Sequence, residues 1–347
     1  MNTSQATRAG LLAGGNWIVD HVKLIDGWPP QDALANILSE SWGNGGSPYN
    51  ILKNLSRLGA PFPLAGIGLL GDDADGARIL ADCRRHRIDT AQLRQIGCAA
   101  TAYSDVMTDG TTGRRTFFHQ RGANALLAPE HFDFSATQAK IFHLGYLLLL
   151  DQLDQLDPVT GDPCAVNVFC RARAAGLLTS LDCVSENSGR FHAVVKPVLP
   201  DVDVLFANDF EAEKLTGITL RTGADGRIQR AAVEAAARAL MRLGVRDRVV
   251  LHFPEAVYAV DAHGSGHWQP SLAVPSSAIK GTAGAGDAFA GGVLYGMHEN
   301  WPITDALRLG VCAAASSLFD ATCSEGVLTV DQCLRLDAAY PWRPLPV

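Results

Sequence analysis

A run of small residues directly before a predicted helix is the segment of this chain best suited to chemistry. Residues 281–292 read Gly-Thr-Ala-Gly-Ala-Gly-Asp-Ala-Phe-Ala-Gly-Gly. Backbone N–H groups in such a turn can converge on an anion, and the helix dipole adds positive potential there. Asp287 stands at the helix start, where a bound phosphate would repel its carboxylate. Accepting the proton of an attacking hydroxyl would explain that position; a simple N-terminal cap is the alternative.

A second glycine-rich segment, residues 66–71, fits the Gly-x-Gly-x-x-Gly pattern of dinucleotide-binding turns. However, the following helix is predicted to begin near Asp75, after Asp72 and Asp73. Two carboxylates at that place would repel a pyrophosphate, which argues against a dehydrogenase. No Gly-x-x-x-x-Gly-Lys-Ser/Thr segment occurs, so the chain is not a P-loop kinase.

Strand-like and helix-like segments alternate along most of the chain. Apolar runs predict strands over residues 11–20, 63–70, 140–148, 177–183, 202–207 and 248–253. Helical periodicity predicts helices over residues 47–58, 75–86, 231–243, 287–297 and 303–320, the first ending at Gly59 as a C-terminal cap. This alternation is typical of an α/β protein with a mostly parallel sheet, which binds ligands at the carboxyl ends of its strands.

Two stretches, at about residues 22–44 and 100–120, break the alternation. They contain period-two runs with polar turns; residues 101–107, for example, alternate and are followed by the turn at Asp109 and Gly110. We expect these stretches to form a small β-lid, with an ordinary edge hairpin as the alternative. No repeat, low-complexity linker or clear boundary divides the chain, so residues 1–347 are expected to form one domain.

Composition and charge limit the classes of function. The chain has 347 residues, of which 47% are hydrophobic and 19% charged, so a sizeable core can form. The net charge of -7 and the lack of a basic run argue against a nucleic-acid partner. The longest apolar run, residues 144–150, falls far short of the ~20 residues that span a bilayer. The eight cysteines form no Cys-x-x-Cys pair, and the N-terminus does not resemble a signal peptide. We expect a cytoplasmic protein without a membrane partner.

Further motifs occur in a fixed order, and with residues 281–292 they resemble the ribokinase-like (PfkB) carbohydrate kinase family. They are Gly-Asn-Trp-Ile-Val-Asp-His at 15–21, Gly-Gly-Ser-Pro-Tyr-Asn at 45–50, Gly-x-x-Gly-x-Asp-x-x-Gly at 68–76, Gly-Ala-Asn at 122–124 and Asn-x-x-Glu at 208–211. The resemblance covers residues 11–328. It implies a three-layer α/β/α fold with a mostly parallel central sheet and a small β-lid.

The resemblance also implies an activity, namely Mg-ATP-dependent transfer of a phosphoryl group to a hydroxyl of a sugar or sugar-derived molecule. Asp287 would be the base, with the amides of Gly284, Ala285 and Gly286 binding the transferred group. Substrate contacts would come from Asp20, Gly45, Gly46, Asn50 and Asn124. The nucleotide would be contacted by Asn208, Glu211, Thr282 and Gly284, with Mg²⁺ held by Glu211 and Asn208 through water. A homodimer through the lid would also fit the family.

Two positions depart from the family pattern. Gly281 stands where the family usually has an Asp that helps build a monovalent-cation site, so potassium activation is in doubt. His252 and Pro254 lie in a loop that usually carries glycines, and Pro254 has no N–H to donate, so nucleotide contacts there are expected to differ. The basic group Arg115, His119 and Arg121 near residues 122–124 allows two interpretations. Its members could contact an acidic or phosphorylated substrate, or they could be solvated charges on the lid edge.

Two other functions stay open at this point. One is a nucleoside kinase of the adenosine type, which would use the same scaffold. The other is a relative that binds ligands for regulation and has weak catalysis. The intact Asp287 and its Gly-Ala-Gly turn argue against the second, whereas Gly281 and Pro254 argue for it.

Overall fold

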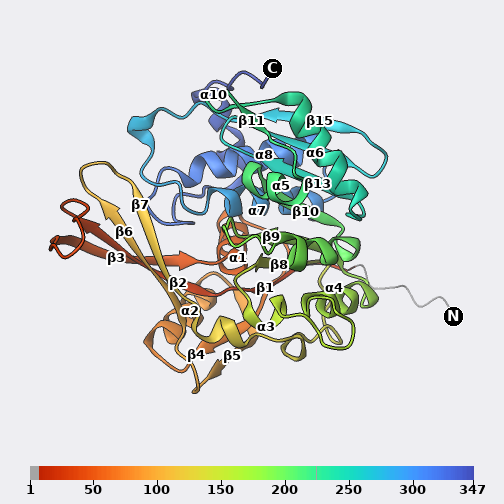
Figure 1. The fold of residues 1–347 in the computed structure, drawn as a ribbon, viewed down its shortest axis with the longest axis horizontal. Helices are drawn as coiled ribbons and strands as arrows, with labels where there is room; N and C mark the ends of the chain where they lie inside the picture. The colour runs from red at the N-terminus through yellow and green to blue at the C-terminus, as the bar shows by residue number, and fades with distance from the viewer. Residues whose placement is uncertain (1–7, 224) are drawn as a thin grey trace.

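A nine-stranded sheet organises the chain in this computed structural model, which describes residues 8–223 and 225–347. Its order is β15-β14-β13-β10-β9-β8-β1-β4-β5 (Figure 1). The strands are β1 (Leu11–Gly15), β4 (Leu64–Gly71), β5 (Ile88–Ile96), β8 (Ile141–Leu147), β9 (Leu178–Cys183), β10 (Val204–Asn208), β13 (Arg248–His252), β14 (Ala256–Asp261) and β15 (Gly266–Pro270). All pairs from β5 to β13 are parallel, and only β14 and β15 pair antiparallel. The sheet is therefore mostly parallel, as predicted.

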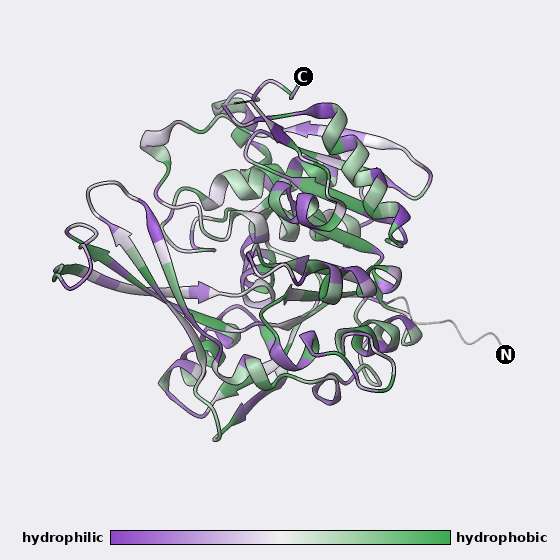
Figure 2. Cartoon of the chain, viewed as in Figure 1, coloured by the Kyte–Doolittle hydropathy of each residue, from purple (hydrophilic) through white to green (hydrophobic). Residues whose placement is uncertain are grey.

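Helices cover both faces of this sheet. They are α1 (Ser47–Leu58), α2 (Ala74–Arg85), α3 (Asp151–Asp154), α4 (Ala165–Ala174), α5 (Asp209–Thr216), α6 (Arg230–Arg242), α7 (Ala285–His298), α8 (Ile303–Ser317), α9 (Val330–Leu334) and α10 (Leu336–Ala339). Neighbouring strand residues belong to different cores: Leu205 packs in the cluster of α4, α5 and α6, and Phe206 in that of α1, α7 and α8. Figure 2 shows the strands between these layers as largely hydrophobic.

A separate four-stranded sheet projects from the side of the main body (Figure 1, left). Its order is β3-β2-β6-β7, from β2 (Ile18–Ile25), β3 (Ile37–Gly45), β6 (Ala102–Asp109) and β7 (Arg115–Gln120). Both stretches expected to form a lid contribute strands to it, and we call this sheet the lid. A further short pair, β11 (Arg221–Thr222) with β12 (Arg227–Ile228), lies before α6.

Most predicted elements agree with the structure to within a few residues, and α1 ends before Gly59 at a φ of 83°, in the left-handed region. The strand predicted over residues 11–20 is instead two strands, β1 and the start of β2, which belong to different sheets. The chain leaves the main sheet at Gly15, whose φ is 128°, and Asp20 lies on β2 of the lid. A Cβ at Gly15 would lie 1.9 Å from the carbonyl oxygen of Gly145, so only glycine permits this change of sheet.

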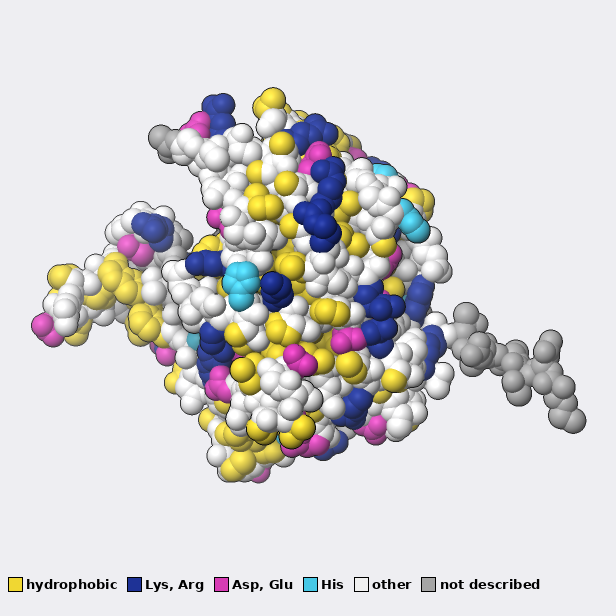
Figure 3. All heavy atoms as spheres, turned by 45° about the vertical axis from the view of Figure 1, so that its right-hand side comes forward, with side chains coloured by type: hydrophobic (Ala, Val, Ile, Leu, Met, Phe, Trp, Pro, Cys, Tyr) yellow, Lys and Arg dark blue, Asp and Glu magenta, His cyan; other side chains and the backbone are white. Residues whose placement is uncertain are grey.

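Surface composition agrees with the mixed charge of the sequence. On the face shown in Figure 3, Lys and Arg side chains lie in small separate groups among acidic and hydrophobic ones. Within residues 8–223 and 225–347, no helix is long and apolar enough to cross a membrane.

Candidate active site

The N-terminus of α7 brings the predicted base next to the predicted anion-binding amides. The helix begins behind Gly284, which has a φ of 74°, in the left-handed region. A Cβ at Gly284 would lie 2.5 Å from the Cβ of Cys323, so a side chain there would clash. Asp287 follows in the first turn and is 3% exposed. The carboxyl group and the free N–H groups of the first helical turn therefore share one end of the helix.

Two side chains from other elements orient the Asp287 carboxyl. Asn50, in α1, donates from Nδ2 to Oδ2 at 2.7 Å. The hydroxyl of Tyr146, at the end of β8, donates to Oδ1 at 2.8 Å and to Oδ2 at 2.7 Å. The group is thus fixed by α1 and β8 as well as by its own helix.

Burial raises the pKa of Asp287 to about 6, although hydrogen bonds from Asn50, Tyr146 and Ser47 act in the opposite direction. A carboxyl group with this pKa is mostly ionised at neutral pH. It is also more basic than an ordinary aspartate, so it is better suited to accept a proton.

A buried chain of hydrogen bonds, from Ser47 through His143 to Ser180, lies behind the Asp287 carboxyl group. We call this chain the relay. Ser47 Oγ lies 2.9 Å from Nε2 of His143, and Nδ1 of the same ring lies 3.0 Å from Oγ of Ser180. Burial lowers the pKa of His143 to about 3, so the imidazole is neutral and donates from one nitrogen while accepting at the other. The relay fixes the hydroxyl of Ser47, which is one of the groups acting on Asp287.

Asp20 faces the same region from the lid. Burial raises its pKa to about 7, and the Asp287 charge adds to this shift, while hydrogen bonds from Cys323 and Ser104 and the charge of Arg115 oppose it. A Cβ at Gly45 would lie 2.6 Å from Oδ1 of Asp20, so glycine is needed for this close approach.

Asn44 lies beside Asp20 and is linked to Asp287 through Asn50. Its Nδ2 donates to Oδ1 of Asn50 at 2.6 Å and to Oγ of Ser324 at 2.8 Å. Because Oδ1 of Asn50 is an acceptor here, its NH₂ group must face Asp287. The buried Oδ1 of Asn44 has no hydrogen-bond partner among the described residues, which leaves one acceptor for a hydroxyl. A narrow pocket of about 10 Å³, which has room for about one water molecule, is lined here by Asp20, Asn44, Arg115, Phe117 and Cys323, among others.

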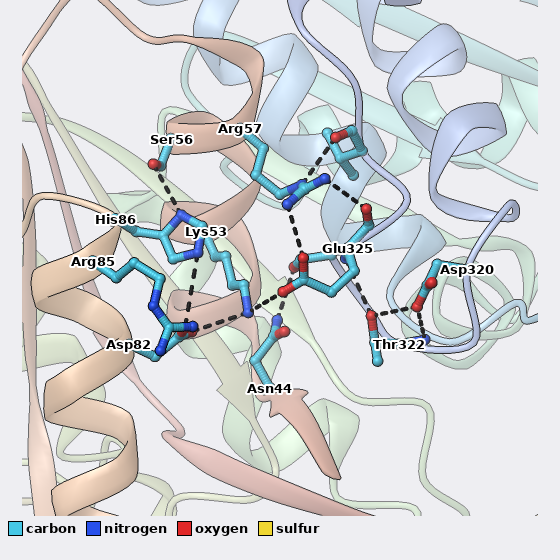
Figure 4. A network of polar contacts seen from close by, with 12 residues as sticks. Asn44, Lys53, Ser56, Arg57, Asp82, Arg85, His86, Asp320, Thr322 and Glu325 are labelled. Carbon is cyan, nitrogen blue, oxygen red and sulfur yellow. Dashed lines mark hydrogen bonds and ion pairs between the residues drawn. The ribbon is translucent and has the colours of Figure 1, made fainter. Parts of the chain in front are cut away.

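A network of ion pairs holds this part of the site together (Figure 4). Lys53 of α1 pairs with Asp82 of α2 at 3.0 Å and with Glu325 at 2.8 Å. Arg57, one turn further along α1, also pairs with Glu325 at 2.8 Å. The helix that carries Asn50 is thus fixed to the loop that carries Ser324.

Two adjoining cavities lie on the other side of Asp287. One, of about 410 Å³, is lined by Tyr146, Asp182, Asn208, Glu211, Thr282 and residues 284–287, among others. The second, of about 550 Å³, shares Asn208, His252 and Thr282 with it. Its lining is mostly apolar and includes Phe210, Phe253, Val257, Phe289, Val311 and Leu318. A polar cavity beside Asp287 thus opens into an apolar cavity that is suited to a planar aromatic group of a ligand.

Asn208 and Glu211 form the capping box of α5. Oδ1 of Asn208 accepts from the Glu211 N–H at 2.9 Å, and Oε2 of Glu211 accepts from the Asn208 N–H at 3.0 Å. Burial raises the pKa of Glu211 to about 7. Burial also raises the pKa of Asp182 well above its usual range. The negative charges of Glu211 and Asp287 raise this pKa further. Three acidic side chains, Asp182, Glu211 and Asp287, therefore line the polar cavity, although within residues 8–223 and 225–347 no three such groups lie close enough together to hold a metal ion by themselves.

The structure does not bring Asn124 to these cavities. Its side chain is fully buried in a 3₁₀ turn, where Oδ1 accepts from the Trp17 N–H at 3.2 Å and Nδ2 donates to the Trp17 carbonyl at 3.1 Å. Asn124 thus holds the connection between β1 and β2, which corrects its expected place against the substrate. Gly46 likewise serves a turn, because its φ is 85° and a Cβ would lie 2.1 Å from the Asn16 carbonyl oxygen.

Several residues of the site were not identified from the sequence. They are Tyr146, Asp182, Asn44, Ser47 and His143. Asn44 carries a usable signal, because it directly precedes the Gly-Gly pair at residues 45–46. Asp182 lies at the carboxyl end of the buried strand β9, where ligands of parallel sheets bind. Tyr146 lies at the end of β8 in the same way, but only the folded arrangement reveals its contact with Asp287.

Comparison with known proteins identifies relatives that share this fold. An ATP-dependent ribose-1-phosphate kinase of Halopiger xanaduensis is 27% identical over 309 residues, 88% of this chain and 91% of that protein. The solved ribokinase of Giardia lamblia superposes with a TM-score of 0.77 at 18% identity, covering 95% of this chain and 99% of that one. Arabidopsis thaliana ribokinase, solved with ribose and ATP, gives 0.74 at 19% identity, covering 95% and 98%. These likenesses confirm the predicted ribokinase-like fold.

The family assignment rests on a match to most of the chain. The family model described as pfkB family carbohydrate kinase matches residues 17–329, from the turn before the lid to the segment after α8. The matched range contains Asp20, Asn50, Glu211 and Asp287. The protein therefore belongs to the pfkB family of carbohydrate kinases.

Proposed function

We propose that this sugar kinase transfers the γ-phosphoryl group of Mg-ATP to a hydroxyl of its acceptor, with Asp287 as the general base. One observation carries the proposal: Asp287 is buried, is oriented by Asn50 and Tyr146, lines the polar cavity beside α7, and lies close enough to Asp20 for its charge to raise the pKa of Asp20. An acceptor and a nucleotide bound on its two sides would meet at this carboxylate.

The reaction follows from the placement of the groups. Asp20 and the free Oδ1 of Asn44 would orient acceptor hydroxyls. The attacking oxygen forms a bond to the γ-phosphorus, the bond from phosphorus to the β,γ-bridging oxygen breaks, and ADP leaves. The proton of the hydroxyl passes to Asp287. The amides of Gly284, Ala285 and Gly286 would donate hydrogen bonds to the transferred group and stabilise its charge.

The nucleotide would occupy the two joined cavities, with its base in the apolar one and its phosphates beside Thr282 and residues 284–286. Arabidopsis thaliana ribokinase has been solved with ribose and ATP, which supports ATP as the donor. Asn208 would contact the phosphates from the start of α5. His252, a departure from the family pattern, lies with its ring 5.4 Å from that of Phe289, so it contributes an aromatic surface in place of a glycine amide.

The acidic groups at the polar cavity fit Mg²⁺. Asp182 and Glu211 supply carboxylate oxygens and Asn208 an amide oxygen, which are hard ligands suited to this ion. Within the described ranges no cluster of three His, Cys, Asp or Glu side chains encloses a metal, so much of the coordination would come from water and phosphate oxygens. Bound there, Mg²⁺ would neutralise negative charge on the phosphates.

The lid offers a surface for a second copy of this chain. Its exposed side chains include Trp28 (49% exposed), Ile37 (48%), Leu38 (59%) and Phe118 (52%), and Trp28 stacks on Phe118. Such a patch on a projecting sheet would be covered in a homodimer. We further propose that the lid and the main sheet act as one kinase domain.

Turnover of the purified protein tests the function. ADP release is measured with Mg-ATP and a panel of sugars, sugar acids, sugar phosphates and nucleosides, the last testing for a nucleoside kinase. At least one sugar-derived acceptor is expected to give sustained release, and Asp287→Asn to abolish it. Failure of every sugar-derived acceptor would disprove the proposed reaction.

A further inference from the structure

A basic cavity lies between the lid and the segment that precedes α7. It has a volume of about 620 Å³ and is lined by Arg114, Arg115 and Lys280, together with Gly281 and Thr282, among others. None of its lining residues is acidic. In the part of the chain that the structure describes, none of these three basic side chains forms an ion pair, although Lys280 lies near enough to Asp320 to lower its pKa. A concave site with three such cations is suited to an anion.

Arg115 connects this basic cavity to the pocket that holds Asp20. It lines both of them, as does Phe117. One Nη2–H bond goes to the Ala321 carbonyl at 3.1 Å, which fixes the guanidinium while leaving most of its five N–H donors available. Its positive charge also lowers the pKa of Asp20. A ligand whose hydroxyls reach Asp20 could therefore place a charged group against Arg115.

Gly281 provides the space for this arginine. A Cβ at Gly281 would lie 2.8 Å from Nη2 of Arg115, and 3.0 Å from the Asp320 carbonyl oxygen. A side chain at position 281 would therefore displace the guanidinium. The other two basic residues near the lid edge are engaged elsewhere: His119 bonds to Ser104 at 3.1 Å, and Arg121 pairs with Asp151. Of the basic group Arg115, His119 and Arg121 noted in the sequence, Arg115 is therefore the residue placed to bind an anion in the cavity.

We propose that the acceptor is an anionic sugar derivative, a sugar acid or a sugar phosphate, whose charged group binds Arg115 in the basic cavity. This inference rests on the proposed phosphoryl transfer and names its substrate class. Arginine suits the role because its planar donors match both carboxylate and phosphate oxygens in pairs. Arg114 and Lys280 add positive potential at the same opening. The reacting hydroxyl, at a distance from the charged group, would lie at Asp287.

Matched acceptor pairs test the proposal in the full-length protein with Mg-ATP. The pairs are ribose with ribose 1-phosphate, fructose with fructose 1-phosphate and fructose 6-phosphate, and glucose with gluconate, so that phosphate and carboxylate are tested separately. We expect kcat/KM to be about 100-fold higher for the charged member of at least one pair. Arg115→Met should lower kcat/KM for that acceptor about 10- to 100-fold and leave the KM for ATP within about twofold. Gly281→Ala should have a smaller effect in the same direction.

Arg84→Met is the matched control, because Arg84 is exposed on α2, away from all of these cavities, and its loss changes the net charge equally. It should leave all rates unchanged. Neutral acceptors that equal or exceed their charged partners would overturn the proposal. The proposal would also be overturned if Arg115→Met lowered kcat/KM equally for the charged and the neutral member of a pair, which would indicate that Arg115 positions the lid. An increase in the KM for ATP in this variant would overturn it as well. If no acceptor supports ADP release, the proposed reaction is wrong. In that case, isothermal titration of the wild type and of Arg115→Met with gluconate and ribose 1-phosphate tests the anion site separately. Equal affinities of the two proteins for these ligands would exclude the site.

Discussion

Asn50 and Asp287 are 237 positions apart in the chain, yet Nδ2 of Asn50 donates to Oδ2 of Asp287 at 2.7 Å in a buried setting. This bond joins α1 to α7 at the place where acceptor and phosphate would meet. Since Asn44 orients the amide of Asn50 in turn, the orientation of the Asp287 carboxyl depends on residues beside the pocket at Asp20.

Asp287→Asn should lower kcat by about 10²- to 10⁴-fold, because the amide cannot accept the proton of the acceptor hydroxyl. The KM for both substrates should change little, since the side chain keeps its size. ADP release and calorimetric binding of ATP measure the two effects. A variant with more than a tenth of wild-type kcat would exclude Asp287 as the base.

The pH dependence of turnover should report the same group. Because burial raises the pKa of Asp287 to about 6, the rate should fall as the pH drops below this value and the carboxylate becomes protonated. Tyr146→Phe removes a hydrogen bond that lowers this pKa, so the acid limb should shift to higher pH and kcat should fall about tenfold. Tyr340→Phe, on the C-terminal segment, is the control. An unshifted limb in Tyr146→Phe would show that another group sets the profile.

Asp20 should reduce stability at neutral pH. Its pKa is about 7 in the folded protein, above the usual 3.8 of an unfolded chain, so the folded state binds the proton more tightly. Stability from this group is therefore complete below pH 3.8 and is lost as the pH rises to 7, by an amount of up to about 4 kcal/mol.

Asp20→Asn should consequently raise the melting temperature more at pH 8 than at pH 5, measured by calorimetry. Asp261→Asn, on a strand end far from the site, controls for general charge effects. Equal shifts at both pH values would show that Asp20 is ionised throughout the range.

Lys53→Met should destabilise the fold by about 3–5 kcal/mol, because it removes the buried cation beside the Asp82 carboxylate and leaves the neutral hydroxyl of Tyr49 as its buried hydrogen-bond donor. Arg85→Met removes another partner of Asp82, but the Arg85 side chain is 71% exposed, so its loss should cost less than about 1 kcal/mol. Urea unfolding of the two variants measures the difference. Similar values would show that burial adds nothing to the Lys53 pair.

Asp182→Asn should raise the Mg²⁺ concentration needed for half-maximal rate about tenfold, since the carboxylate lines the polar cavity with Glu211. Titration of Mg²⁺ at fixed ATP measures this. Asp154→Asn provides a comparison, because that buried carboxylate accepts from the N–H groups of Leu148 and Leu150 instead. If Mg²⁺ dependence stays unchanged in Asp182→Asn, the metal is held elsewhere.

Local patterns predicted the parallel sheet, its main helices and the place of Asp287 in the first turn of α7. These features can be read from residues close together in the sequence, namely a glycine turn before a helix and a regular spacing of hydrophobic residues. The contacts of Tyr146 and His143 could not be predicted in this way, since each joins strands and helices that meet only in the fold. Asn124 shows the opposite error. Its motif was recognised, but its amide binds the backbone of Trp17, a contact that residue types alone do not reveal.

The lid strand β3 ends at Gly45 and α1 begins at Ser47, so a single residue separates the lid from the helix that carries Asn50. A displacement of the end of that strand would reach the first turn of the helix through Gly46 alone. A sugar that fits the lid poorly would then react more slowly for two reasons. It would bind more weakly, and the Asp287 carboxyl would be less well aligned with its hydroxyl. Selection among similar sugars would accordingly exceed what their affinities alone could supply.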